Sequence, residues 1–174
     1  MKPTRILSDE HKNILRVIDI LAKKADELEK EKNINMDFFE KIIEFIRNYA
    51  DKFHHAKEED ILFREFNKAA EDGCVHCNPV EQMLFEHDEG RKFVKGMEEG
   101  VNENNKNKTI ENARNYCRLL KEHILKEDNI LYPMAAQALS REIQEKISKE
   151  FGLVEKKKKA DKERYEKFAD SLEK

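Results

Sequence analysis

One short pattern appears twice in this chain, first as His54-His55-Ala56-Lys57-Glu58-Glu59-Asp60-Ile61-Leu62-Phe63 and again as His123-Ile124-Leu125-Lys126-Glu127-Asp128-Asn129-Ile130-Leu131-Tyr132-Pro133. In each copy a histidine is followed four residues later by a glutamate, Glu58 in the first and Glu127 in the second. Positions four apart lie one above the other on the same face of an α-helix. Two such helices facing each other would enclose nitrogen and oxygen atoms suited to iron, manganese or zinc.

The composition around this repeat indicates an all-α protein. A length of 174 residues suggests one domain, and 39% hydrophobic residues are enough for a core beneath a surface that is rich in charge. The chain has only 5 Gly and 3 Pro, fewer than turn-rich β architectures use.

Charge and hydropathy exclude some classes of function. The net charge of −3, from 34 basic and 37 acidic residues, argues against a general nucleic-acid-binding protein. No apolar run approaches the roughly 20 residues of a membrane span, and the N-terminus does not resemble a secretory signal. An odd number of cysteines, 3, fits a reducing compartment. We therefore expect a cytoplasmic protein without membrane association.

Hydrophobic periodicity predicts an up-down-up-down bundle of four helices over residues 1–140, followed by a helical extension over residues 141–174. The expected helix starts lie at capping or proline residues: Ser8, Asn35, Pro79, Thr109 and Ser140. The second helix is expected to end near Gly73, and Gly152 is a candidate break in the fifth. Leu84 and Ile130 are expected on inner faces. The extension either packs outside the bundle or binds a protein partner.

Four of the 6 histidines, one on each bundle helix, are expected at a comparable depth in the core: His11, His54, His87 and His123. A buried imidazole costs free energy unless its polar atoms are satisfied, and several at one level can be satisfied together by a metal. We therefore predict a metal site formed by these histidines with Glu58 and Glu127. His55 and Glu59 are either further ligands or hydrogen-bond partners of ligands.

The strings HHAKEEDILF, EHDEGR and HILKEDNILYP, with the histidine on the first helix, resemble hemerythrin-like (HHE cation-binding) domains over about residues 5–140. The resemblance implies a four-helix bundle with two non-haem iron ions. Carried over by motif, His11, His54, His87 and His123 would be terminal ligands, and Glu58 and Glu127 would bridge the ions. Zinc or manganese remains an alternative metal.

The chain departs from the oxygen-carrying hemerythrins, which have a second histidine one turn from the first on the third helix. Met83 and Arg91 stand at those positions around His87. One iron would then lack a protein nitrogen unless His55 or Glu59 replaces it, and an open position would admit dioxygen, nitric oxide or peroxide.

A separate motif, Cys74-x-x-Cys77 with His76 between the cysteines, lies in the loop before the third helix. It could be a redox pair, part of a zinc site with Cys117, or an ordinary pair of loop thiols. Cys117 is otherwise expected to be a small core residue.

Three functions stay open. The first is a di-iron protein that binds dioxygen, nitric oxide or related small ligands for sensing, storage or scavenging. The second is a di-iron enzyme acting on peroxide or nitric oxide, or an iron donor for repair of iron-sulfur centres. The third is an interaction module that uses the charged C-terminal helix.

Overall fold

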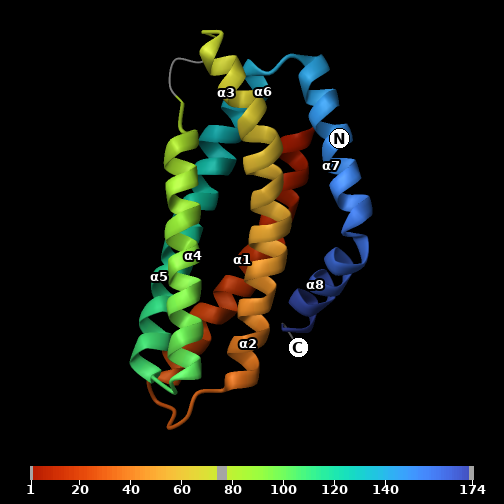
Figure 1. The fold of residues 1–174 in the computed structure, drawn as a ribbon. Helices are drawn as coiled ribbons and strands as arrows, with labels where there is room; N and C mark the ends of the chain where they lie inside the picture. Colours follow the sequence, from red (N-terminus) through yellow and green to blue (C-terminus); the bar gives the residue numbers. More distant parts are fainter. Residues whose placement is uncertain (1, 74–77, 173–174) are drawn as a thin grey trace.

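The computed structural model describes residues 2–73 and 78–172, and helices without strands make up this part of the chain. Four helical rods lie side by side (Figure 1). The first is α1 (Pro3–Leu28) and the third is α4 (Val80–Asn102). The second rod consists of α2 (Met36–Phe45), η1 (Ile46–His55), η2 (Glu58–Leu62) and α3 (Phe63–Glu71). The fourth rod consists of α5 (Lys106–Lys126), η3 (Glu127–Leu131) and α6 (Tyr132–Ala138). The predicted all-α bundle is confirmed.

Local sequence signals set several helix ends. The side chain of Asn35 accepts a hydrogen bond from the Phe38 amide, and Ser140 caps α7 (Arg141–Lys157) in the same way. Gly73 follows α3 with φ of 78°, a conformation that glycine adopts without steric cost. These three expected boundaries are confirmed.

Three other expectations about the helices were wrong. Helix α1 begins at Pro3 and not at Ser8, because a proline is well accommodated in the first turn, where its missing N–H is not needed. Helix α5 begins at Lys106, where Asn105 supplies the cap. The fifth helix continues through Gly152, since an exposed glycine weakens a helix without ending it.

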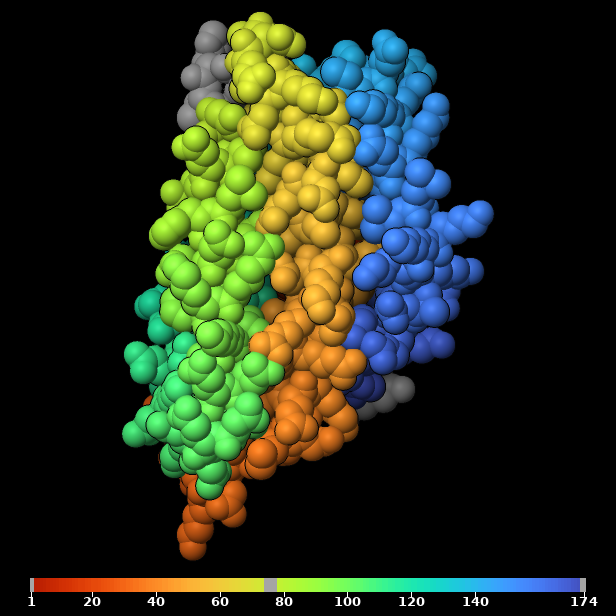
Figure 2. Space-filling view, in the orientation of Figure 1, coloured from red at the N-terminus to blue at the C-terminus, as the bar shows by residue number. Residues whose placement is uncertain are grey.

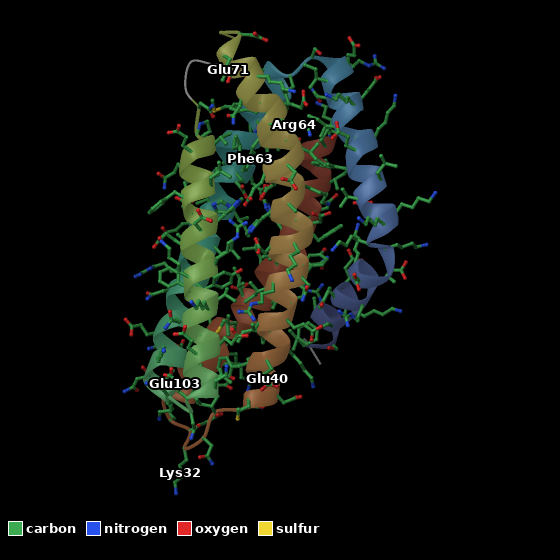
Figure 3. All side chains as sticks on the ribbon, in the orientation of Figure 1. Lys32, Glu40, Phe63, Arg64, Glu71 and Glu103 are labelled. Atoms are coloured by element: carbon green, nitrogen blue, oxygen red, sulfur yellow. The ribbon has the colours of Figure 1, made fainter. Side chains whose placement is uncertain are left out.

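The core consists of two apolar clusters with a polar layer between them. Along α1, Leu7 belongs to one cluster and Ile14 to the other, and His11 lies between them. The other rods repeat this order, so the layer lies at one level of the bundle. Leu84 and Ile130, predicted to face inward, are instead 36% and 51% exposed. Figure 3 shows nitrogen- and oxygen-tipped side chains pointing into the space between the rods.

Two further helices, α7 (Arg141–Lys157) and α8 (Lys159–Ser171), cover one side of the bundle (Figures 1 and 2). Phe151 of α7 is fully buried in one core cluster, and Tyr165 of α8 is buried in the other. Among the described residues, no helix combines the length and the apolar character needed to cross a membrane.

Glu65 joins α3 to α7 and provides a test of this docking. Burial alone would raise the pKa of its carboxyl, but hydrogen bonds from Lys146, Arg64 and Lys68 lower the pKa to about 2. A lowered pKa means that Glu65 contributes stability above its ordinary value near 4.5, and that this contribution is lost as the pH falls towards 2.

We expect Glu65→Gln to lower the free energy of unfolding by about 1 kcal/mol at pH 7, because the three cations are partly exposed. Urea unfolding of both proteins between pH 7 and pH 2.5 measures the difference. It should shrink as the pH falls below 4.5, whereas a constant difference would show that the ion pairs are not its cause.

Candidate metal centre

Both copies of the repeat lie where the backbone changes from α-helical to π-helical hydrogen bonding. His54 is near the end of η1 and Glu58 begins η2, while Glu127 begins η3. Short π-helical segments are rare and are found mostly at functional sites. The sequence contains no glycine or proline in these segments that would signal the change.

The two motif glutamates form the centre of the polar layer, and both are fully buried. Glu127 places Oε2 3.3 Å from Nε2 of His11 and Oε1 3.2 Å from Nε2 of His123. Glu58 places Oε2 3.6 Å from Nε2 of both His54 and His87. Each carboxylate therefore lies between two imidazoles that belong to different rods.

The possible ligand atoms fall into two groups, and within each group all of these atoms lie within 4.8 Å of one another. The first group is His55, Glu58, His87 and His123. The second group is His11, His54, Glu58 and Glu127. Glu58 belongs to both. Within the first group, Nε2 of His87 and Nε2 of His123 are 2.9 Å apart. Two nitrogens bound to one ion at about 2.0–2.1 Å and at a right angle would be about 3 Å apart. The spacing suits two ligands of a single metal.

The sequence left His55 open as either a further ligand or a hydrogen-bond partner of a ligand. The structure places a ring nitrogen of His55 among the inner ligand atoms. Glu58 lies three residues after His55 and four residues after His54, and residues three or four apart are neighbours on the surface of a helix. Both histidines can therefore lie beside Glu58. His55 is therefore the candidate for the nitrogen that Met83 and Arg91 do not supply.

Every one of these imidazoles has a carboxylate oxygen near Nδ1. The partners, with their distances, are Asp128 for His11 at 3.1 Å, Glu10 for His54 at 2.9 Å, Asp51 for His55 at 3.5 Å, Glu59 for His87 at 2.7 Å and Glu86 for His123 at 2.9 Å. An ionised carboxylate only accepts hydrogen bonds, so Nδ1 carries the hydrogen in His11, His54, His87 and His123, whereas Nδ1 of His55 makes no hydrogen bond among the described residues. In four of the rings Nε2 is then directed at the two central glutamates, as in carboxylate–histidine–metal arrangements.

Burial and neighbouring charges pull the pKa values of the central groups apart. Burial and the charge of Glu127 raise the pKa of Glu58 well above its usual range. Burial would also raise the pKa of Glu127, but His123 and His11 hold it well below. Burial lowers the pKa of the His123 imidazole, yet Glu127 outweighs it and the pKa rises to about 9. A proton on His123 therefore balances the charge of Glu127.

Several central atoms are buried without a hydrogen-bond partner among the described residues: Nε2 of His54, Oε2 of Glu58, and both carboxylate oxygens of Glu127. Burial also lowers the pKa of His54 well below its usual value, which keeps the imidazole neutral with a free lone pair on Nε2. Leaving such atoms unsatisfied is costly. The neutral imidazole of His54 and these carboxylate oxygens fit a divalent metal, which would take the place of the proton on His123.

A buried ion pair between Glu10 and Lys57, which was not predicted from the sequence, orients the ring of His54. Glu10 accepts hydrogen bonds from His54 Nδ1 and from Nζ of Lys57, whose side chain is completely buried. The ammonium also lies 4.0 Å from the ring centre of Phe53 and 5.4 Å from that of Phe151 on α7.

The second half of the site repeats this arrangement. Glu86 accepts hydrogen bonds from His123 Nδ1 and from Nζ of Lys126. Sequence comparison of the two halves could have found the pair, because each glutamate directly precedes an inward histidine and each lysine directly precedes a motif glutamate. Unlike the buried Lys57, Lys126 keeps 35% of its side chain exposed.

The two copies differ at several positions, and two of these differences change the groups around the centre. His55 corresponds to Ile124 in the second copy, so only one ligand group gains a third histidine. Tyr132 corresponds to Phe63, and its hydroxyl donates to Glu58 Oε1 at 2.5 Å and lies 3.3 Å from His11 Nε2. The group with two histidines therefore has the phenol beside it.

The cysteine predictions have different outcomes. Cys117 is a core residue, as expected: its thiol is buried, lies 3.3 Å from the Ile18 carbonyl oxygen, and has its pKa raised to about 12 by burial. Cys74, His76 and Cys77 lie outside the described residues, so their redox or zinc role stays a prediction.

Comparison with known proteins agrees with this site. A sequence model of the hemerythrin HHE cation-binding domain matches residues 2–135, which include all six predicted ligands and His55. No curated protein and no solved structure matches the chain. The matched residues cover most of the chain and end before α7. The chain belongs to the hemerythrin HHE cation-binding domain family.

Proposed function

We propose that this protein holds two non-haem iron ions and binds dioxygen, nitric oxide or a related small ligand at them. The observation that carries the proposal is the position of Glu58 and Glu127, each between two imidazoles from different rods. A carboxylate shared by two sets of nitrogens is suited to bridge two ions. Family membership supports a metal as the occupant.

The two ligand groups would differ in how many protein atoms they offer. One would use His55, His87 and His123, and the other His11 and His54. Glu58 belongs to both groups, and Glu127 would be shared through its contact with His123 at 3.2 Å. The group with two histidines has more room for an outside ligand. We therefore place the exchangeable position there, beside the hydroxyl of Tyr132.

Iron bound at this site would supply the electrons and the open coordination position for a diatomic molecule. The chain's own residues orient the ligands and exclude water. The carboxylates near Nδ1 hold the imidazole rings in place, and all of the proposed ligand side chains are buried. The hydroxyl of Tyr132, which donates a hydrogen bond to Glu58 Oε1, lies beside the same position.

Metal analysis of anaerobically purified protein, with optical spectra before and after exposure to air, tests the proposal. We expect two irons per chain and a band in the near ultraviolet or visible that appears with oxygen. A band that bleaches reversibly supports binding or sensing, whereas turnover of peroxide or nitric oxide favours the enzyme. One metal or none in a folded protein would contradict the di-iron proposal.

A further inference from the structure

A cavity of about 220 Å³ lies between η1, α4 and α5, next to the group of three histidines. His55, His87 and His123 line it, and Ile46, Val94, Leu119 and Leu120 supply apolar walls. The histidines of the other group, His11 and His54, are not among its lining residues. The cavity therefore does not lead to the position that we assign to the diatomic ligand.

The charged groups that line the cavity are paired within the protein. Arg91 contacts Asp51 at 2.8 Å and Glu59 at 2.7 Å, and Arg47 binds Glu98 through two hydrogen bonds. The remaining acid, Glu86, is held by His123 and Lys126. A charged ligand would have to break one of these pairs, so the lining favours a neutral ligand.

One polar group in the wall is left unsatisfied. Tyr116 is only 2% exposed, and its hydroxyl has no hydrogen-bond partner among the described residues. Burial raises the pKa of this phenol well above its usual value, so the hydroxyl keeps its proton and can donate. Gly90 leaves space in front of the ring, since a Cβ there would lie 3.5 Å from Tyr116 Cε2.

We propose that this cavity binds a small neutral organic molecule with one hydrogen-bonding oxygen, such as a ketone, an aldehyde or an alcohol, and that Tyr116 anchors the oxygen. A cavity of about 150 Å³ can hold benzene, so this one has room for a ring of about six to ten non-hydrogen atoms. A diatomic ligand would leave most of it empty. The site goes beyond the di-iron proposal and does not depend on which metal is bound.

Cyclohexanone and methylenecyclohexane, which differ by C=O against C=CH2 in nearly the same shape, provide a matched pair of probes. Calorimetric titration of the purified protein with its metals measures both affinities. Water also hydrogen-bonds the ketone, so the contribution of Tyr116 is measured by the change in each affinity on mutation and not by the ratio of the two affinities. In Tyr116→Phe the affinity for cyclohexanone should fall about three- to tenfold, from the loss of one hydrogen bond, while the affinity for methylenecyclohexane stays the same.

Gly90→Leu should fill the cavity and abolish binding of both probes, whereas Gly152→Leu, an exposed helical glycine away from the cavity, should leave binding unchanged. Circular dichroism checks that the variants fold, and Leu119→Phe replaces Gly90→Leu if that variant does not. No binding of either probe, or an unchanged affinity for cyclohexanone in Tyr116→Phe, would overturn the proposal. Metal analysis of the same samples keeps the two proposals separate, because missing iron with intact ketone binding contradicts only the di-iron assignment.

Discussion

Replacing Glu127 or Glu58 with alanine is expected to remove at least one metal ion per chain and to lower the free energy of unfolding by about 3–4 kcal/mol. Each glutamate lies between imidazoles of both ligand groups, so either substitution takes an oxygen ligand away from two proposed ions. A ligand that binds only the folded state stabilises it by about 4 kcal/mol at a thousand times its dissociation constant. Metal analysis and urea unfolding of the purified variants measure both effects.

Glu65→Ala is the matched control, because Glu65 is also a buried glutamate but lies outside both ligand groups. It should keep both metals. The same comparison after chelation separates metal loss from packing: without metal, Glu58→Ala should cost much less, since burial and the charge of Glu127 already make the ionised form of Glu58 unfavourable. If both Glu58→Ala and Glu127→Ala keep two metals, the bridging assignment is wrong.

Replacing Lys57 with methionine is expected to lower the free energy of unfolding by about 3–5 kcal/mol, the usual cost of breaking a buried ion pair. The change leaves the carboxylate of Glu10 buried without its cation. It also disturbs the hydrogen bond that His54 Nδ1 donates to Glu10, so we expect weaker metal binding. Chelator competition measures the metal affinity.

The internal symmetry of the site supplies the control for this prediction. Lys126 makes the corresponding contact with Glu86, but water reaches its side chain. Lys126→Met should therefore cost about 1 kcal/mol or less. If Lys57→Met and Lys126→Met lower the free energy of unfolding equally, burial under α7 does not determine how much the lysine contributes to stability.

The sequence by itself determined the helical architecture and most of the proposed centre. Spacings of three and four residues are set by the helix geometry, so they placed His54 and Glu58 on one face before any packing was known. The side chains of Asn35 and Ser140 cap helices through hydrogen bonds to backbone amides three residues away, and such local contacts can be predicted from sequence. The same rule could have placed His55 beside Glu58, because the two residues are three apart in the sequence.

Only the tertiary structure decided which groups surround the ligands. Glu10 reaches His54 from another rod, and Phe151 comes from a helix about a hundred residues further along the chain to help bury Lys57. The partly open cavity beside Tyr116 also depends on how α4 and α5 pack. Such contacts depend on the relative positions of whole rods, which the periodicity of one helix does not encode.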